Sequence, residues 1–217
     1  MQTVKTLMML SICFLILVAC DTDPEAQYRT GDVLLQQTFE DAPTWDNLAR
    51  DAVSVGTRAG AYRMVANVNS YVRGFERVEQ FDNVVIEFET NQYTQERNNA
   101  YGVICRGSTD PLGTNGYYFL IAADGSYSIR IGQYREVNGL VKWRSHQAIN
   151  EGLSRNRIRV ICIDDYLALY VNDTFIADVR DDTYSRGYLG FVVTTEATTE
   201  IEIAFDNLIV MVGELVE

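Results

Sequence analysis

Short segments of alternating apolar and polar residues run through nearly the whole chain, and they limit its fold more than any other feature. Alternation with period two places successive side chains on opposite faces of a strand, and no stretch keeps the 3.6-residue period of a helix over three turns. The expected strands, about twelve in number, are residues 33–39, 61–66, 84–90, 101–106, 117–122, 127–133, 142–147, 157–163, 166–171, 175–179, 187–194 and 200–210.

Turn signals separate these segments. Asp124-Gly125, Asn138-Gly139 and Asn172-Asp173 are pairs that form tight turns, and such turns join neighbouring antiparallel strands. Many short strands joined in this way are typical of a sandwich of two sheets. The sequence therefore predicts an all-β fold, a two-sheet antiparallel jelly-roll sandwich, in one domain over residues 32–213.

The first twenty residues read as a secretion signal. Lys5 provides a positive start, residues 7–18 are almost entirely apolar, and Leu17-Val18-Ala19-Cys20 closes the segment. This ending resembles the lipobox of bacterial lipoproteins, in which the cysteine becomes the first mature residue and carries the lipid. We therefore expect a signal peptide over residues 1–19 and a lipidated Cys20 with a tether over residues 20–31. An ordinary signal peptide or an N-terminal anchor is the alternative.

Lipidation at Cys20 would hold the domain at the cell membrane on its extracytoplasmic side, because several acyl chains give a stable anchor.

The charge of the chain argues against nucleic acid as a partner. Asp and Glu number 30 against 18 Lys and Arg, a net charge of −12, and the basic residues form no cluster. Nucleic acid is therefore not an expected partner, since phosphate binding needs clustered positive charge.

Two cysteines, Cys105 and Cys162, lie beyond the signal, each in an apolar strand segment. An oxidising compartment permits a disulfide between them. Two buried free cysteines, packed as small hydrophobic residues, are the alternative. The chain has one histidine and no Cys-x-x-Cys motif, which argues against a structural zinc site.

A set of motifs between residues 101 and 210 carries a resemblance to a known superfamily. The set includes Tyr101-Gly-Val-Ile-Cys-Arg106, Leu169-Tyr-Val-Asn-Asp173, Gly187-Tyr-Leu-Gly190 and Phe205-Asp-Asn-Leu208. In order and spacing it resembles the concanavalin A-like lectin/glucanase superfamily, with the laminin-G-like and 3-keto-disaccharide hydrolase-like bacterial domains as the nearest branches. The resemblance implies a jelly roll with one convex and one concave sheet. It specifies no activity, since this fold serves lectins, enzymes and interaction modules.

Sugar recognition combines aromatic faces with planar polar groups. Candidates for a ligand-binding groove are Arg106, Tyr118, Arg130, Tyr134, Trp143 and His146. The competing interpretation for each aromatic residue is that it fills space between the sheet and its loops.

Carboxylates at the ends of the domain suggest a second kind of site. Glu40 and Asp41 end the first expected strand and Asp206 lies in the last, and terminal strands of many β-sandwich sugar-binding modules share a calcium ion. The sequence thus predicts either no cofactor or a structural calcium ion held by these three residues. Turn capping by the same carboxylates is the alternative.

No complete catalytic motif is present. Glu87 with Glu89, and Glu200 with Glu202, each place two carboxylates on one strand face, but both pairs lack the third acid of the glucanase motif. We therefore expect a membrane-anchored extracytoplasmic module that binds a glycan or another surface ligand without catalysis. The alternatives are a glycoside-active hydrolase of the 3-keto-disaccharide hydrolase-like kind and an envelope scaffold for protein interactions.

Overall fold

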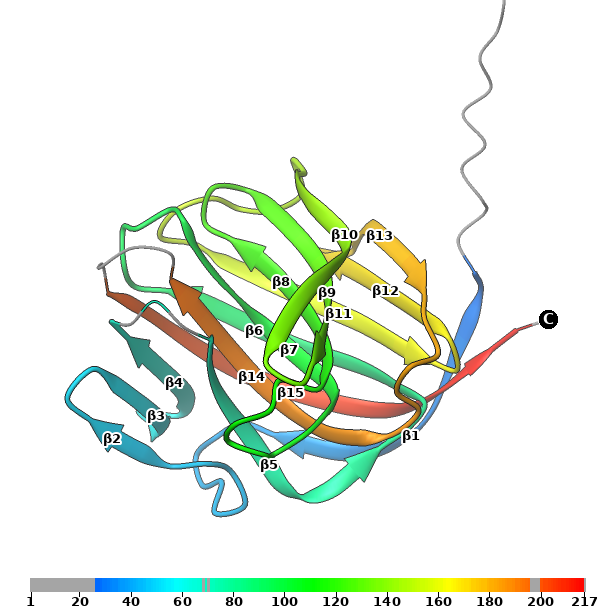
Figure 1. Cartoon of the computed structure of the whole chain (residues 1–217), viewed down its shortest axis with the longest axis horizontal. Helices are drawn as coiled ribbons and strands as arrows, with labels where there is room; N and C mark the ends of the chain where they lie inside the picture. The colour runs from blue at the N-terminus through cyan, green and yellow to red at the C-terminus, as the bar shows by residue number, and fades with distance from the viewer. Residues whose placement is uncertain (1–25, 68, 70, 196–199, 217) are drawn as a thin grey trace, which may run out of the picture.

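A computed structural model describes residues 26–67, 69, 71–195 and 200–216 as fifteen strands in two antiparallel sheets (Figure 1). The predicted signal peptide and Cys20 lie outside these residues. No helix in the described part of the chain could cross a membrane. The strands are β1 (Tyr28–Gln37), β2 (Leu48–Arg50), β3 (Val53–Arg58), β4 (Ala61–Ala66), β5 (Tyr71–Phe81), β6 (Val84–Gln92), β7 (Asn99–Gly107), β8 (Gly116–Ala122), β9 (Ser126–Gln133), β10 (Glu136–Ser145), β11 (Arg155–Ile163), β12 (Tyr166–Val171), β13 (Thr174–Arg180), β14 (Gly187–Thr195) and β15 (Ile201–Leu215).

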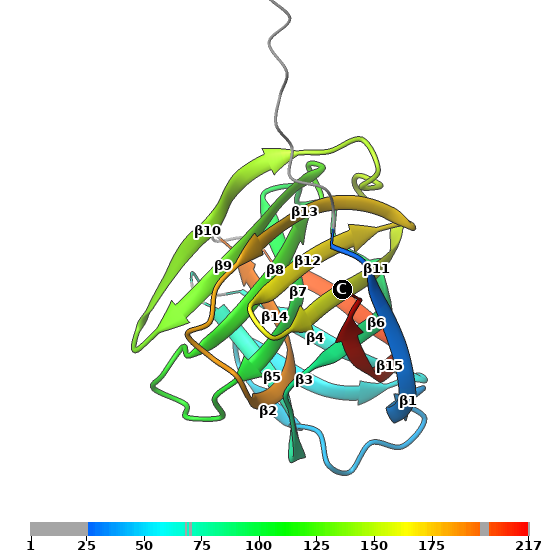
Figure 2. The ribbon, with the colours of Figure 1, turned by 90° about the vertical axis from the view of Figure 1, so that its right-hand side faces the viewer.

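The six-stranded sheet has the order β10-β9-β8-β7-β14-β5. The nine-stranded sheet has the order β13-β12-β11-β6-β15-β4-β3-β2, and β1 also pairs with β15. Strand β15 is long enough to pair with both β4 and β1: its first residues pair with β4 and its last residues with β1. Tyr28 is paired with Leu215, so the start of the described chain lies beside its end (Figure 2).

The main core fills the space between the sheets. Phe191 of β14 and Phe205 of β15 stack with ring centroids 4.2 Å apart, and Trp45 from the loop before β2 stacks on Phe191. All three side chains are buried. Strand alternation supplies this core, because every second residue of each central strand points inward.

A disulfide between Cys105 of β7 and Cys162 of β11 joins the two sheets across this core. The bond spans 57 residues of sequence. It lies near the ends of both strands, and each half-cystine is buried.

The predicted sandwich is confirmed, but several element boundaries differ. Residues 28–31, expected in the tether, are the start of β1, and residues 28–30 pair with β15. The strands β2, β3 and β5 were not expected. Two of them, β2 and β5, are edge strands, which bury only part of one face and therefore carry charged residues in place of clean alternation.

The Asn138-Gly139 turn prediction is wrong. These residues lie within β10, and the hairpin turns at Tyr134, whose φ is +58°. Contacts from the loop between β7 and β8 hold the turn there: the backbone N–H of Tyr134 donates to Asn115 Oδ1 at 2.7 Å, and Thr114 N–H donates to the Tyr134 carbonyl at 2.7 Å. A tertiary contact thus outweighs the local turn preference.

Candidate functional site

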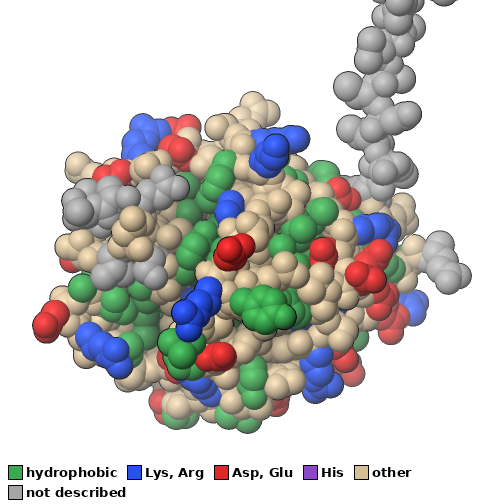
Figure 3. Space-filling view, in the orientation of Figure 1, with side chains coloured by type: hydrophobic (Ala, Val, Ile, Leu, Met, Phe, Trp, Pro, Cys, Tyr) green, Lys and Arg blue, Asp and Glu red, His purple; other side chains and the backbone are tan. Residues whose placement is uncertain are grey.

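The outer face of the six-stranded sheet, which points away from the main core, carries three rows of side chains that cross the strands. Residues paired across a ladder point to the same face, so the register defines these rows. The first row is Ala122, Ala100, Thr194 and Tyr71; the second is Ser128, Leu120, Gly102, Val192 and Arg73; the third is Arg130, Tyr118, Ile104, Gly190 and Phe75. Hydrophobic side chains come to the surface on this face, with charged side chains both among them and around them (Figure 3).

Large side chains fill the third row. The ring of Tyr118, which is in this row on β8, contacts the ring of Tyr71, which is in the first row on β5. Their centroids are 5.7 Å apart, although two strands separate β8 from β5. The Tyr118 and Tyr71 side chains therefore converge over the strands between them, as expected on a concave face. Tyr118 is buried and its hydroxyl donates to the Thr114 carbonyl at 2.7 Å. Burial raises the pKa of Tyr118 to about 12, and Arg73 opposes that shift. Tyr118, a predicted ligand residue, thus packs beneath the surface.

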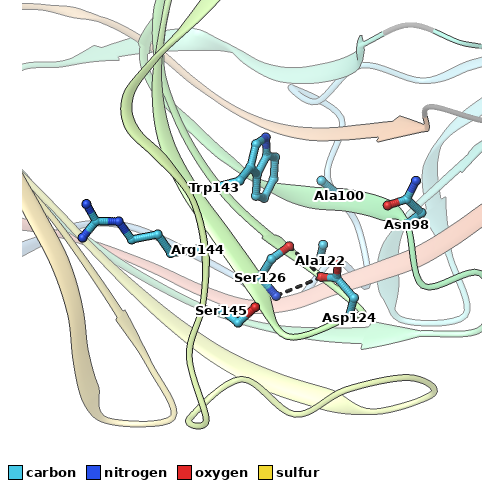
Figure 4. Close-up of a pocket in the computed structure, with 8 residues that line it drawn as sticks. All are labelled: Asn98, Ala100, Ala122, Asp124, Ser126, Trp143, Arg144 and Ser145. Atoms are coloured by element: carbon cyan, nitrogen blue, oxygen red, sulfur yellow. Dashed lines mark hydrogen bonds between the residues drawn. The ribbon is translucent and has the colours of Figure 1, made fainter.

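The first row stays open at its β10 end, where a cleft of about 350 Å³ forms. We call it the Trp143 cleft. Its lining residues come from the start of β7, the β8–β9 hairpin and the end of β10: Asn98, Ala100, Ala122, Asp124, Ser126, Trp143, Arg144 and Ser145. Figure 4 shows the Trp143 indole beside Ala100, Ala122 and Ser126, while Arg144 points away from them.

A bulge in β10 sets the direction of Trp143. Val141 pairs with Ile129 and Arg144 with Tyr127, so two residues, Lys142 and Trp143, lie opposite the single residue Ser128. A bulge of this kind turns a side chain out of regular alternation. The Trp143 indole remains 40% exposed. Small residues on the neighbouring strands leave the space that the indole borders.

The polar groups of the Trp143 cleft are few. Asp124 Oδ1 accepts hydrogen bonds from the backbone N–H of Ser126 at 2.9 Å and from its hydroxyl at 2.6 Å. The side chains of Asn98 and Ser145 are exposed at the rim. An aromatic face beside an amide, a hydroxyl and one carboxylate is an arrangement that suits a hydroxyl-rich ligand with an apolar side.

Arg106, predicted as a ligand residue, lies between the ends of the two sheets instead. Gly190 pairs with Ile104 and Tyr188 with Gly107, so β7 has a bulge at Cys105 and Arg106, and Arg106 has a φ of +52°. This bulge turns its side chain away from the concave face. The side chain is buried, and burial lowers the pKa of its guanidinium.

All five N–H donors of the Arg106 guanidinium are occupied. Their acceptors, at 2.8–3.3 Å, are the backbone carbonyls of Asp82, Cys162, Asp164 and Tyr184 and the side-chain carbonyl of Asn83. No donor is left for a ligand. The ligand prediction for Arg106 is therefore corrected: its hydrogen bonds connect β7 of the six-stranded sheet to β11 and to loops at the same end of the sandwich.

The structure separates the remaining predicted ligand residues. Arg130 lies half-buried in the third row and donates to the Val137 carbonyl at 2.7 Å. Tyr134 is 85% exposed at the far end of the β9–β10 hairpin, about 20 Å from Trp143 by the rise per residue. His146 lies in the turn after β10, where its Nδ1 accepts from the Ala148 N–H at 3.2 Å. Of the six predicted residues, only Trp143 lines the Trp143 cleft.

Sequence reasoning missed the other seven lining residues: Asn98, Ala100, Ala122, Asp124, Ser126, Arg144 and Ser145. The Asp124-Gly125 turn marks where β8 and β9 meet, and this signal could have placed Asp124 and Ser126 beside each other. Nothing in the sequence indicates that the start of β7 and the end of β10 meet at the same place, because β10 pairs only with β9.

The paired glutamates considered for catalysis lie on the outer face of the nine-stranded sheet. Glu87 accepts from Arg157 and Arg159, each at 2.7 Å, and Glu202 pairs with Arg63 at 2.7 Å. Burial would raise the pKa of Glu87, but the two arginines outweigh it and hold the pKa below its usual range. These carboxylates are structural ion-pair partners on the opposite side of the molecule from the Trp143 cleft.

The structure does not bring Glu40, Asp41 and Asp206 together as a set of ligands. Among the described residues, no three His, Cys, Asp or Glu side chains are grouped so that they could hold a metal ion. Asp206 instead accepts from the Asn207 backbone N–H at 2.7 Å. Structural calcium therefore stays an untested prediction.

No protein-family model and no curated protein matches the sequence. Solved structures do match, at low identity. The carbohydrate-binding module CBM66 from Bacillus subtilis aligns with a TM-score of 0.59 at 12% identity, covering 80% of this chain and 97% of its own. A protein of unknown function with a galectin-like fold from Bacillus subtilis aligns at 0.64 and 12% identity, covering 86% and 99%. The β-glucanase of Bacillus licheniformis aligns at 0.59 and 11% identity, covering 85% and 99%.

The chain therefore has the concanavalin A-like jelly-roll fold that its sequence predicts. This fold is shared by glycan-binding modules, galectin-like proteins and glucanases. Identities this low establish the fold alone, so the function has to be argued from the site.

Proposed function

We propose that this protein is a lipid-anchored, extracytoplasmic module that binds a glycan without catalysis in the Trp143 cleft. The observation that carries the proposal is the half-exposed Trp143 indole beside a floor of small side chains on the concave face. The C–H face of a sugar ring would stack on the indole. Asn98, Ser145 and Asp124 would bond its hydroxyls.

The hydrolase alternative requires two carboxyl groups facing one cleft at a defined separation. The described residues that line the Trp143 cleft include one carboxylate, Asp124, and its Oδ1 is occupied by Ser126. Non-catalytic binding is therefore the function this arrangement favours.

The membrane anchor belongs to the same proposal. Cys20 would carry the lipid, and eight positions separate it from Tyr28, the first residue of β1. A fully extended chain of that length spans at most about 28 Å, so the domain would stay close to the membrane surface. A Cys20→Ser variant should move from the membrane to the soluble fraction.

A glycan array with a soluble form starting at Asp21, which keeps every described strand, tests the binding site. Wild type and Trp143→Ala would be compared, with and without calcium. The expected result is a defined glycan signal that falls at least about tenfold in Trp143→Ala while circular dichroism is unchanged. Tyr134→Ala, which removes an exposed aromatic at the far end of the same hairpin, is the matched control. Equal binding by the two variants would reject the site.

A further inference from the structure

A second hollow opens at the other edge of the concave face, beside β5. Its volume is about 610 Å³, and we call it the arginine cleft. Arg50, Arg73 and Arg77 line it, together with the aromatic rings of Tyr71 and Phe75. Three guanidinium groups in one cleft stand out in a chain whose net charge is −12.

The acidic side chain in this cleft is already neutralised. Asp46 forms a two-pronged ion pair with Arg77, with Nε–Oδ1 at 2.5 Å and Nη2–Oδ2 at 3.0 Å. Asp46 also accepts from the Phe75 backbone N–H at 3.0 Å. The carboxylate of Asp110, in the neighbouring loop, accepts from the Leu112 N–H. Within the described chain, Arg50 and Arg73 thus have no carboxylate partner.

Arg73 is held in place but incompletely bonded. Its Nη2 donates to the carbonyls of Asp110 and Pro111 at 3.3 and 3.5 Å, both long for hydrogen bonds. Its Nη1 is buried and has no hydrogen-bond partner. Its guanidinium carbon lies 5.7 Å from the centre of the Phe75 ring. The Arg73 guanidinium is therefore positioned by neutral groups, and among the described residues no carboxylate balances its charge.

Guanidinium groups fit planar or tetrahedral oxyanions, because they offer two parallel N–H donors. A positive cleft also attracts such groups locally even on an acidic domain, since the field is focused by the surrounding protein. The arginine cleft therefore has the chemistry of a site for a carboxylate or a sulfate ester.

The arginine cleft and the Trp143 cleft open on the same concave face. The row of Ala122, Ala100, Thr194 and Tyr71 runs from one to the other. Five strand spacings separate β10 from β5, a path of about 24 Å. A ligand that occupies both clefts would therefore be an oligosaccharide rather than a single sugar.

We propose that the arginine cleft binds a carboxylate or sulfate group of a glycan through Arg50 and Arg73, which makes acidic glycans the ligand class of this face. This inference rests on the proposed glycan-binding function. It adds a charge preference that the Trp143 cleft alone would not give.

Retention by immobilised polysaccharides tests this preference with matched pairs: polygalacturonate against its methyl ester, and dextran sulfate against dextran. Arg50→Gln/Arg73→Gln removes two charges from the cleft. Arg58→Gln/Arg135→Gln removes two charges from exposed positions elsewhere and is the control. Arg50→Gln alone, at an exposed position, covers the case in which replacing Arg73 disturbs folding. Circular dichroism checks the fold of each variant.

We expect one acidic polymer to be retained at least about tenfold more strongly than its neutral counterpart at 50 mM salt, with the preference lost in Arg50→Gln/Arg73→Gln and kept in the control. The polymer retained distinguishes carboxylate from sulfate. Equal retention of acidic and neutral forms, or equal loss in both double variants, would overturn the proposal. Trp143→Ala separates the two proposals: unchanged total retention in this variant would reject the Trp143 cleft, whereas an acidic preference in the retention that remains would still support the arginine cleft.

Discussion

The Nη2 atom of Arg106 donates a hydrogen bond to the backbone carbonyl of Cys162 at 3.3 Å, and the sulfur of Cys162 is bonded to Cys105, the residue before Arg106. One disulfide and one guanidinium thus join the same ends of β7 and β11. The two sheets of the sandwich are linked there by a covalent bond and by a charged group whose donors are all used. Both links can be tested separately.

Replacing Arg106 with Met should destabilise the domain by about 3 kcal/mol or more, because five acceptors, one buried and four partly buried, lose their donors at once. Urea unfolding followed by tryptophan fluorescence measures this loss. Arg135→Met, at an exposed turn position, should change stability by less than about 0.5 kcal/mol. An equally small effect in Arg106→Met would contradict the structural role.

Removing the disulfide should also destabilise the domain. Chain entropy predicts a loss of about 4 kcal/mol for a loop of 57 residues, and measured losses commonly fall between about 2 and 4 kcal/mol. The Cys105→Ala/Cys162→Ala variant should therefore unfold at a lower temperature than the oxidised wild type. Adding a reductant should lower the melting temperature of wild type and leave that of the variant unchanged. A reductant effect on both proteins would point to another cause.

Filling the floor of the Trp143 cleft should block binding without touching the indole. Ala100 lies on the floor and is nearly buried, so Ala100→Leu would project three extra carbons into the cleft. We expect retention of the glycan found on the array to fall at least about tenfold. Ala49→Leu, on the exposed edge strand β2, is the control and should bind like wild type. Unchanged binding by Ala100→Leu would mean that the ligand lies elsewhere.

Acid should weaken the sandwich partly through Glu87. Hydrogen bonds from Arg159 and Arg157 hold the folded-state pKa of Glu87 below its unfolded value, despite the opposing effect of burial. The unfolded state therefore binds the proton more readily. The stabilisation by Glu87 is fully present above its unfolded pKa and is lost as the pH falls through its lower folded pKa.

The Glu87→Gln variant tests this contribution. It should be less stable than wild type by about 1 kcal/mol at pH 7, and the difference should shrink toward pH 3. Urea midpoints measured between pH 7 and pH 2.5 give the comparison. A difference that stays constant over this range would show that the carboxylate charge is not responsible. Glu136→Gln, at the exposed first residue of β10, provides the control.

Much of the architecture was predictable from local pattern. Central strands such as β7, β8, β11 and β12 are buried on both faces or alternate cleanly, so their sequences carry a strong signal. Edge strands such as β5 have one face in water. Charged residues, which prevent such an edge from pairing with other chains, interrupt the alternation of apolar and polar residues from which a strand is predicted.

The candidate site was predictable only at Trp143. Its aromatic character could be read from the chain, but the turn expected just before it, at Asn138-Gly139, lies within β10. The direction of its side chain depends on a bulge opposite Ser128, and bulges follow from how two strands fit together. The same physics misled the prediction for Arg106, where a bulge turned an expected outward residue inward.

The sequence by itself determined the all-β sandwich and the pairing of apolar faces into one core, because alternation of side chains is a local property of each strand. Only the tertiary structure decided which residues meet across strands: Asn98 with Trp143 at one edge of the concave face, and Arg50 with Arg73 at the other. Register, bulges and sheet curvature place these groups together, and each of them is set by contacts between segments far apart in the chain.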